Sequence, residues 1–158
     1  MAMLKGAKPH PPVHDPHHEV FIGVQRASNV LGAVMYDLCH RFDLTVAQFN
    51  VMLLIKYREH ELTQSDLGKL LVVTRASITS VLDKLEAKHL VVRRKVAGNR
   101  RIHHVRLTAE GELALREIEP VYRESARQAL EPLSARQHAD LCAMLDMIGE
   151  HVAGSAGI

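Results

Sequence analysis

The sequence predicts a mainly α-helical fold with one small β-hairpin, and two observations support this prediction. Apolar residues recur every three or four positions over most of the 158 residues, which is the period of amphipathic helices. Between residues 88 and 108 this period gives way to β-branched residues on both sides of Gly98-Asn99, a pattern typical of a hairpin. With 47% hydrophobic and 24% charged residues, the chain has the composition of a globular protein that buries a core.

The cysteine content and the apolar runs favour a soluble, cytoplasmic protein. Cys39 and Cys142 are too few for the disulfide framework of a secreted scaffold. The longest apolar runs span about five residues, far fewer than the roughly 20 that cross a bilayer. The N-terminal region also lacks the apolar segment of a signal peptide, so no membrane partner is expected.

The first element is a flexible His/Pro-rich tail over residues 1–18, where Pro16 and two earlier prolines are expected to break any helix. The four histidines of this tail fit no specific metal site, so neither a metal nor a cofactor is expected. From Val20 to Phe42 the apolar residues follow helical spacing and predict a long amphipathic helix.

Serine and threonine N-caps mark the start of the later helices. The capping pairs are Thr45 with Gln48, Thr63 with Asp66, and Ser134 with Gln137, and Thr74 and Thr108 are further caps. These starts predict helices over residues 46–58, 64–71, 75–88, 109–130 and 135–152. Pro120 is expected to kink the helix that contains it or to divide it in two. Residues 90–96 and 101–107 are expected to form the hairpin.

The positive charge is concentrated in one third of the chain. Residues 56–106 contain 12 Lys and Arg against 5 Asp and Glu, whereas the rest of the chain contains 8 against 13. A localised basic face is expected of a polyanion binder, although a solvated charged face has the same composition. Aromatic residues make up only 4% and Trp is absent, which argues against stacking on single strands. Duplex DNA is therefore the expected polyanion.

The order helix, short turn, helix and hairpin is that of a winged helix-turn-helix. The turn Val72-Val73 leads into the second helix, which has one apolar stripe and an opposite face rich in small hydroxyl residues. Such residues let a helix approach a groove floor and donate hydrogen bonds to bases or phosphates. The candidate DNA-binding residues of this helix are Thr74, Arg75, Ala76, Ser77, Thr79, Ser80 and Lys84. An ordinary solvated face is the alternative.

The predicted wing also concentrates positive charge. Five cations and no acid lie within residues 93–101, namely Arg93, Arg94, Lys95, Arg100 and Arg101. These cations repel one another unless a polyanion lies near, and a hairpin can place an arginine into a narrow minor groove. The candidate DNA-binding residues of the wing are Arg94, Lys95, Arg100 and Arg101.

A set of motifs between Leu62 and Gly111 has a specific order and spacing. It comprises Leu62-Thr63-Gln64, Leu67, Ile78-Thr79, Leu82-Asp83-Lys84-Leu85-Glu86, Leu90-Val91, Arg94, Arg100-Arg101, Leu107-Thr108 and Gly111. In these features the sequence resembles the MarR family of winged helix-turn-helix transcription regulators. The helix order on both sides also matches, so the resemblance covers roughly residues 19–152.

The resemblance implies a homodimer that places two recognition helices, residues 74–88, in successive major grooves of a pseudo-palindromic operator. It implies a transcription repressor that releases DNA when a small-molecule effector binds. Arg101 would be the wing-tip arginine in the minor groove. Candidate pocket walls, which would serve equally as core, are Val34, Leu38, Phe49 and Leu53.

Two residues depart from the family pattern. Asn99 stands where the family commonly has Asp, so a charged partner for the wing-tip arginine is missing, although Asn99 stays a candidate DNA-binding residue. His89 stands where the family has Gly, which matters little if His89 adopts a left-handed or turn conformation. The expected organisation is a tail over residues 1–18, a helical dimerisation region over residues 19–44 and 109–158, and a winged helix-turn-helix domain over residues 45–108.

The apolar stripes of the first and last helices favour a dimer independently of the resemblance. The residues expected in the interface are Val20, Val24, Leu141, Leu145 and Ile148, with His138 and Val152 on the same seam. Packing of the two helices against each other within one chain is the alternative.

The sequence contains no nucleophile–base pair, metal triad or glycine-rich phosphate loop, so we expect that the protein is not an enzyme. Three alternatives remain: an architectural DNA-binding protein, a winged-helix module that binds only protein, and a redox-responsive regulator that uses Cys39. Since the cations near Cys39 are limited to His40 and Arg41, a buried thiol is favoured there, and Cys142 is expected to be a packing residue.

Overall fold

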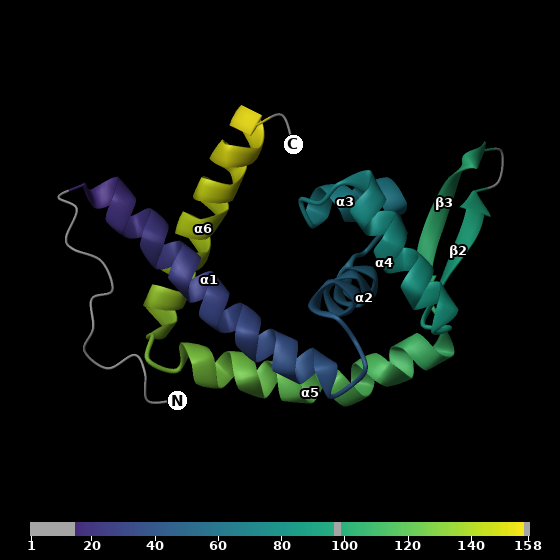
Figure 1. The fold of residues 1–158 in the computed structure, drawn as a ribbon, viewed down its shortest axis with the longest axis horizontal. Helices are drawn as coiled ribbons and strands as arrows, with labels where there is room; N and C mark the ends of the chain where they lie inside the picture. The colour runs from purple at the N-terminus through teal and green to yellow at the C-terminus, as the bar shows by residue number, and fades with distance from the viewer. Residues whose placement is uncertain (1–14, 97–98, 157–158) are drawn as a thin grey trace. The chain divides into compact units, whose positions relative to one another are not determined.

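The computed structural model describes residues 15–96 and 99–156. Its elements, in chain order, are α1 (Pro16–His40), α2 (Val46–Tyr57), β1 (Leu62–Thr63), α3 (Gln64–Leu70), α4 (Arg75–Ala87), β2 (Val91–Val96), β3 (Asn99–Leu107), α5 (Ala109–Leu130) and α6 (Ala135–Ala156) (Figure 1). Helices dominate and the strands form one small antiparallel sheet, so the predicted fold class is confirmed. The chain divides into two compact units, of which the first ends at Val34 and the second begins at Met35. Within the described ranges, no helix is long and apolar enough to cross a membrane.

Helix α1 begins at Pro16, so the prediction that Pro16 breaks the helix is wrong. The Asp15 carboxylate accepts a hydrogen bond from the backbone N–H of His17 at 2.9 Å, and the Asp15 carbonyl accepts one from Glu19 at 3.1 Å. Proline is tolerated at the first helical position because the N–H that it lacks would have no partner there. Residues 1–14 of the predicted tail lie outside the described residues.

The predicted N-caps form, and helices α2 to α6 all begin at the predicted residues. In α2 the Thr45 hydroxyl accepts from the Gln48 N–H at 3.2 Å, while the Gln48 side-chain oxygen accepts from the Thr45 N–H at 2.9 Å. Thr63 and Asp66 form the same capping box at α3. Caps of this kind depend on residues within one turn, which explains why they can be predicted from the sequence.

The sheet has the order β1-β3-β2. The predicted hairpin is present, with Val91 opposite Leu107 and a change of register between Lys95 and Val96. Strand β3 begins at Asn99, two residues earlier than predicted, because Asn99 pairs with Val96. Strand β1 was not predicted; it places Leu62 opposite Val105 and joins the segment before α3 to the base of the wing.

The buried core lies in the second unit and connects every element from the end of α1 to the middle of α5. Phe49 of α2 is fully buried and meets Tyr122 of α5 edge to face, with ring centroids 5.2 Å apart. The other large buried side chains are Leu38, Met52, Leu62, Leu67, Ile78, Leu82, Leu85, Leu115, Ile118, Val51 and Val105. Because three of these belong to α4, one face of that helix is fixed to the core.

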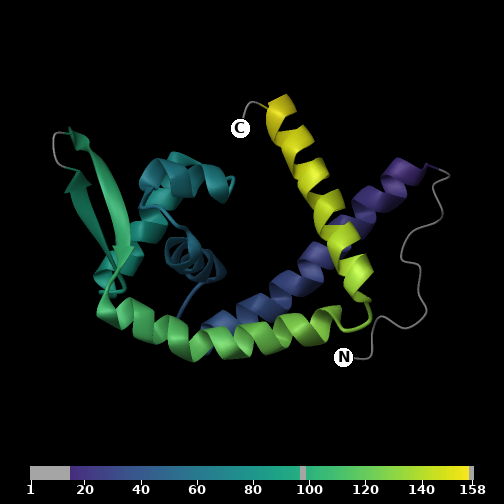
Figure 2. The same ribbon diagram turned by 180° about the vertical axis from the view of Figure 1, so that it is seen from behind.

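Helix α5 starts against the end of α4. The Thr108 hydroxyl donates to the His89 carbonyl at 2.6 Å and accepts from the Gly111 N–H at 3.0 Å. A Cβ atom on Gly111 would lie 2.0 Å from the Leu90 carbonyl oxygen, so only glycine allows this close approach. The helix continues across Pro120 and bends midway (Figures 1 and 2), which agrees with a kink and not with a divided helix.

A buried carboxylate fixes α5 to α2. Glu119 is buried on α5 and accepts hydrogen bonds from Lys56 Nζ at 2.5 Å, from the Tyr57 hydroxyl, and from Arg123 Nη2 at 2.6 Å. These donors, above all Lys56 and Tyr57, lower the pKa of Glu119 to about 2 from its usual 4.5. The carboxylate therefore stays ionised at neutral pH and is matched by two cations.

Candidate nucleic-acid interface

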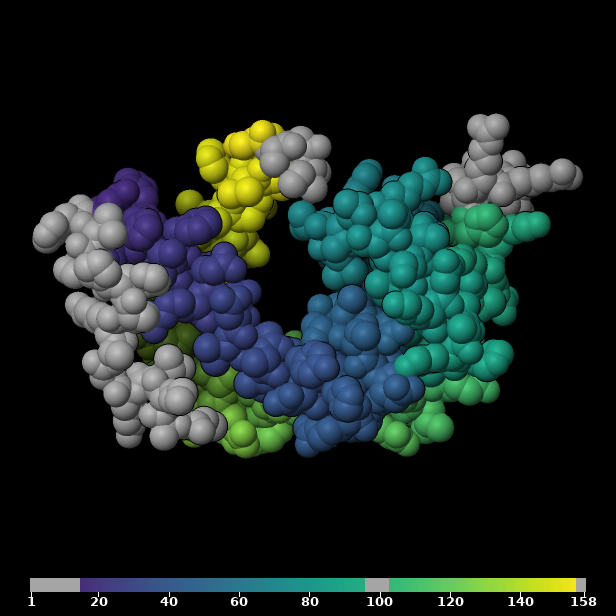
Figure 3. All heavy atoms as spheres, in the orientation of Figure 1, coloured from purple at the N-terminus to yellow at the C-terminus, as the bar shows by residue number. Residues whose placement is uncertain are grey.

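The face of α4 opposite the core is exposed. Ile78, Leu82 and Leu85 are buried on one side of the helix. Of the candidate DNA-binding residues in α4 and its N-cap, those exposed to solvent are Thr74, Arg75, Ala76, Ser77, Ser80 and Lys84. The space-filling view in Figure 3 places the atoms of α3 and α4 (teal) together at the surface. A helix held on one side and exposed on the other has the form that enters a DNA groove.

The N-terminus of α4 carries hydroxyl groups in a fixed arrangement. The Thr74 hydroxyl accepts from the backbone N–H of Ser77 at 3.2 Å and lies 2.9 Å from the Ser77 hydroxyl. Both side chains are exposed, so they retain hydrogen-bonding capacity for a partner at the positive end of the helix dipole.

Thr79 has a different environment from the other candidates. Its half-buried hydroxyl donates to the Arg75 carbonyl at 2.7 Å and accepts from Gln64 Nε2 at 2.5 Å. These bonds link α3 to α4. Thr79 thus helps to hold the two helices in register, and its direct contact with DNA remains a prediction.

Arg93 is not a free cation of the wing, contrary to its expected place in the cluster of five. Its guanidinium lies 2.7 Å from Asp83 and 2.9 Å from Glu86, and only 21% of its side chain is exposed. Its backbone N–H also donates to Glu86 at 2.9 Å. Arg93 therefore ties β2 to α4, and the acids of α4 neutralise it.

Arg94 and Lys95 are exposed on β2 and remain available for a polyanion. The side chains of Asn99, Arg100 and Arg101 lie outside the described part of the structure, so their contacts stay predictions. The sequence analysis did not predict the ion pairs of Arg93 with Asp83 and Glu86. A signal for them was present, because two acids three residues apart lie on the helix that precedes the basic strand.

His89, which stands where the family has Gly, adopts a left-handed conformation with φ of 57°. This is the condition under which the missing glycine was expected to matter little. The His89 N–H donates to the Glu86 carbonyl at 2.9 Å, and the Leu90 N–H donates to the Leu85 carbonyl at 3.0 Å. These two bonds form the left-handed termination in which glycine is usual. The path from α4 into the wing is therefore kept despite the missing glycine.

The predicted interface residues on α1 and α6 are exposed in the single chain. Exposure is between 39% and 58% for Val20, Val24, Leu141, Leu145 and Ile148. Val152 of the same seam is also exposed, and His138 is half-buried, with Nε2 3.0 Å from the Leu130 carbonyl oxygen.

The four residues proposed as pocket walls do not share one environment. Leu38 and Phe49 are fully buried in the core, and Leu53 packs against it. Val34 is exposed and belongs to the first unit. The pocket assigned to these residues stays a prediction.

The cysteines differ from each other. Cys39 is buried, as expected, and burial raises the pKa of its thiol, which disfavours the reactive thiolate. Cys142 is exposed on α6, so its expected role as a packing residue is wrong within the single chain.

A helix-turn-helix whose second helix carries an attached β-hairpin defines a winged helix-turn-helix protein. Residues 42–102 match the model of the MarR family. The regulator PecS of Dickeya dadantii is 23% identical over 131 residues, which are 82% of this chain and 79% of PecS. Residues 42–102 thus carry the MarR-family domain, and the chain is similar to MarR-type transcription regulators along most of its length.

Solved structures support the same fold. AbsC, a MarR family regulator of Streptomyces coelicolor, superposes with a TM-score of 0.82 at 20% identity, covering 92% of this chain and 99% of AbsC. A mutant of E. coli MarR crystallised with operator DNA gives a TM-score of 0.76 at 22% identity, covering 87% of this chain and 99% of MarR.

Proposed function

We propose that the protein is a homodimeric transcription regulator that binds duplex DNA in a sequence-specific manner in the cytoplasm and represses genes until a small ligand releases it. The observation that carries this proposal is the exposed face of α4, with Thr74, Arg75 and Ser77 at its N-terminus. The proposed DNA contacts are made by this face and by the wing residues Arg94 and Lys95, together with Asn99, Arg100 and Arg101.

Two further observations support recognition of duplex DNA. The ion pairs of Arg93 with Asp83 and Glu86 hold the wing against α4, so both elements can meet one DNA surface together. In addition, the E. coli MarR mutant with the same fold was crystallised with operator DNA. A rigid pair of helix and wing favours base recognition over diffuse charge attraction.

The homodimer is proposed because apolar residues are exposed on α1 and α6. Leu145 and Ile148 lie on one face of α6, and exposed apolar rows of this kind mark interaction surfaces. Leu145→Asp should therefore give a monomer in light scattering. Met147→Asp is the matched control, since Met147 is exposed on another face of the same helix. A dimeric Leu145→Asp variant would contradict the proposed interface.

Selection of duplexes from a random pool tests the DNA-binding proposal. The protein should enrich a pseudo-palindrome whose half-sites are about 10 bp apart, because a two-fold dimer presents its helices one turn apart. In fluorescence anisotropy, Arg75→Ala should weaken binding of the selected duplex and lower the salt slope by about one. Arg136→Ala on α6 removes the same charge away from the interface and should leave binding unchanged. Equal affinity for selected and scrambled duplexes would favour an architectural protein instead.

A further inference from the structure

Gln64, the first residue of α3, places its side-chain amide against α4, although the sequence analysis did not count it among the DNA contacts. Gln64 is half-buried, and its Nε2 lies 2.5 Å from the hydroxyl oxygen of Thr79. Arg75 and Thr79 are four residues apart, so they lie along one face of α4. The amide of Gln64 therefore borders the same row of α4 as Arg75, whose exposed side chain we propose to bind DNA.

The hydrogen bonds of Thr79 determine the orientation of the Gln64 amide. The Thr79 hydroxyl donates its single hydrogen to the Arg75 carbonyl at 2.7 Å. It must therefore accept on its other side, so the part of Gln64 that faces it is the NH₂ group and not the oxygen. One N–H of Gln64 is used in this contact, and the second N–H and Oε1 remain.

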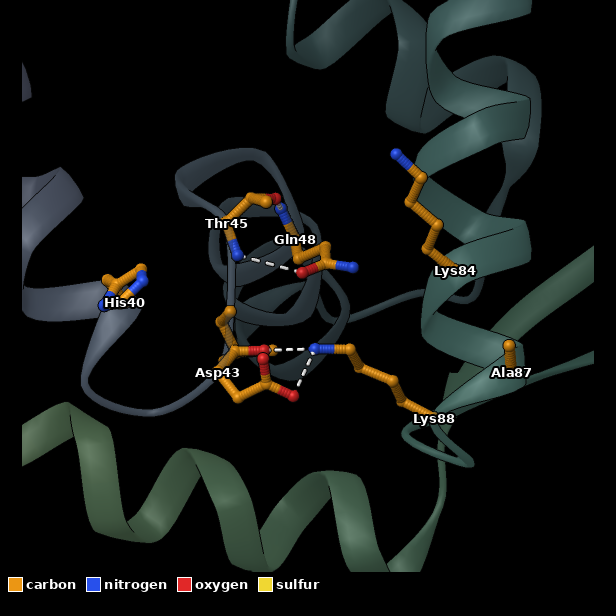
Figure 4. A pocket seen from close by; sticks show the side chains of 8 residues that line it. His40, Asp43, Thr45, Gln48, Lys84, Ala87 and Lys88 are labelled. Carbon is orange, nitrogen blue, oxygen red and sulfur yellow. Dashed lines mark hydrogen bonds and ion pairs between the residues drawn. The ribbon is translucent and has the colours of Figure 1, made fainter.

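The side-chain oxygen of Gln64 is free, in contrast to that of Gln48. At the start of α2 the Gln48 oxygen accepts from the Thr45 N–H and completes a capping box, as a dashed line in Figure 4 shows. At the start of α3 the Asp66 carboxylate does this for the residue before Gln64, at 2.9 Å. Gln64 Oε1 accepts no hydrogen bond from the described residues. It is accessible to solvent, because within the described ranges only Arg93 Nε is both buried and without a partner.

An acceptor beside a donor matches the major-groove edge of one base. Adenine presents its N6–H as a donor and N7 as an acceptor, and a glutamine amide can bind both at once. Guanine presents two acceptors, one of which would face the glutamine oxygen, and a phosphate presents only acceptors. Cytosine and thymine offer one such group each. The free oxygen of Gln64 therefore favours a base over a phosphate, and adenine over the other bases.

We propose that Gln64 is a specificity-determining residue of the DNA-binding surface and that its amide recognises one adenine in each half-site of the operator. This inference rests on the proposed function, because it requires α4 to lie in the major groove. Thr79 is then a positioning residue, which holds the amide edge in place through its hydroxyl. A side chain held before binding loses less conformational freedom on contact, which favours discrimination between bases.

Anisotropy titrations of the full-length protein with the selected duplex and its single-base-pair variants test the assignment. The wild-type protein should prefer adenine over each other base by at least about fivefold at one position of each half-site. Gln64→Glu removes the amide donor and keeps an acceptor, and the Thr79 hydroxyl can turn to donate to the new carboxylate. Because a carboxylate accepts from N4 of cytosine, the preference at that position should change from adenine to cytosine. Preferences at the other positions should stay as they are.

Two further variants separate base recognition from other roles. Gln137→Glu makes the same change in the capping box of α6 and should keep the preference for adenine. Thr79→Val removes the hydroxyl that holds Gln64 and keeps the branched shape, so discrimination at the adenine position should fall while the other positions keep theirs. A role of Gln64 in linking α3 to α4 alone would not change the order of preference among bases at a single position.

The outcomes distinguish this inference from the proposed function. If Gln64→Glu weakens binding of all duplexes alike and keeps the adenine preference, the inference is overturned, because the amide then faces a phosphate or only links the two helices. A wild-type protein without an adenine preference at any position overturns it as well. In both cases a wild-type protein that still discriminates between selected and scrambled duplexes supports the proposed function. Equal affinity of the wild-type protein for these two duplexes overturns both.

Discussion

Arg93 on β2 and Asp83 on α4 form an ion pair, with Nη2 of Arg93 2.7 Å from Oδ1 of Asp83. Glu86, one turn further along α4, accepts from the same guanidinium and from the backbone N–H of Arg93. The wing is thus attached to α4 through one side chain as well as through the chain connection. This attachment determines which cations of the wing remain for a ligand.

Replacement of Arg93 should therefore affect stability, whereas replacement of its neighbour should not. Arg93→Ala removes the cation that pairs with Asp83 and Glu86 and leaves the space of its half-buried side chain empty. The free energy of unfolding should therefore fall by about 1–3 kcal/mol. Arg94→Ala removes the same charge from an exposed position and should change it by less than about 0.5 kcal/mol. Urea unfolding measures both. Equal effects of the two variants would show that the ion pairs of Arg93 contribute nothing.

Val72 in the turn before α4 has φ of 53°, a conformation in which a β-branched residue is strained. Its N–H donates to the Lys69 carbonyl at 3.1 Å, and the Val73 N–H donates to the Gly68 carbonyl at 3.0 Å, which holds the turn in place. Val72→Gly should raise the free energy of unfolding by about 1 kcal/mol because the strain disappears. Val73→Gly, next to it and without positive φ, should lower it. If Val72→Gly were less stable than the wild type, the contacts of the Val72 side chain would stabilise the fold by more than the backbone strain at this residue destabilises it.

Gly111→Ala should strongly destabilise the protein. Its Cβ would lie 2.0 Å from the Leu90 carbonyl oxygen, a backbone atom that moves only with the end of α4. We expect a loss of more than about 2 kcal/mol in denaturant unfolding. Gly154→Ala on α6 meets open space and should change the free energy of unfolding by less than about 0.5 kcal/mol. A tolerated Gly111→Ala variant would mean that α5 can shift at its start.

The Glu119 cluster predicts a specific loss of stability in acid. The pKa of Glu119 is about 2 in the folded protein, below its usual 4.5, so the ionised carboxylate contributes stability that is complete above about pH 4.5. This contribution is lost as the pH falls toward 2. Glu119→Gln should be less stable at neutral pH and should lose less on acidification over that window. Chemical denaturation at each pH measures the free energy of unfolding, and Glu117→Gln, at an exposed neighbouring position, is the control. If the stability of Glu119→Gln depended on pH as that of the wild type does, the assignment would be contradicted.

Local signals account for most of what the sequence could predict. Thr45, Thr63 and Thr108 cap their helices through residues within one turn, so the helix starts followed from short motifs. The exposed face of α4 followed in the same way from one apolar stripe. Pro16 was misjudged because the same residue breaks a helix interior and is accepted at a first position.

Features that depend on distant partners could not be predicted in this way. Leu62 pairs with Val105, and Glu119 receives Lys56, over separations that no local pattern reveals. The same holds for Arg93. Its position in the sequence places its charge in the wing, but in the structure this charge is paired with Asp83 of α4. Positive charge in a sequence therefore overstates the positive charge available at a surface.

The central claim, that the exposed face of α4 binds DNA, is tested most directly by Ala76→Asp. Ala76 is exposed in the first turn of α4, where an acid suits the helix dipole, so the variant should fold with unchanged stability. A carboxylate there would face the DNA phosphates and bases, and anisotropy titration with the selected duplex should show at least about a hundredfold loss of affinity. Ala129→Asp, an exposed alanine of α5, adds the same charge and should bind as the wild type does. Wild-type affinity in Ala76→Asp would contradict the account, because DNA would then be bound elsewhere on the protein.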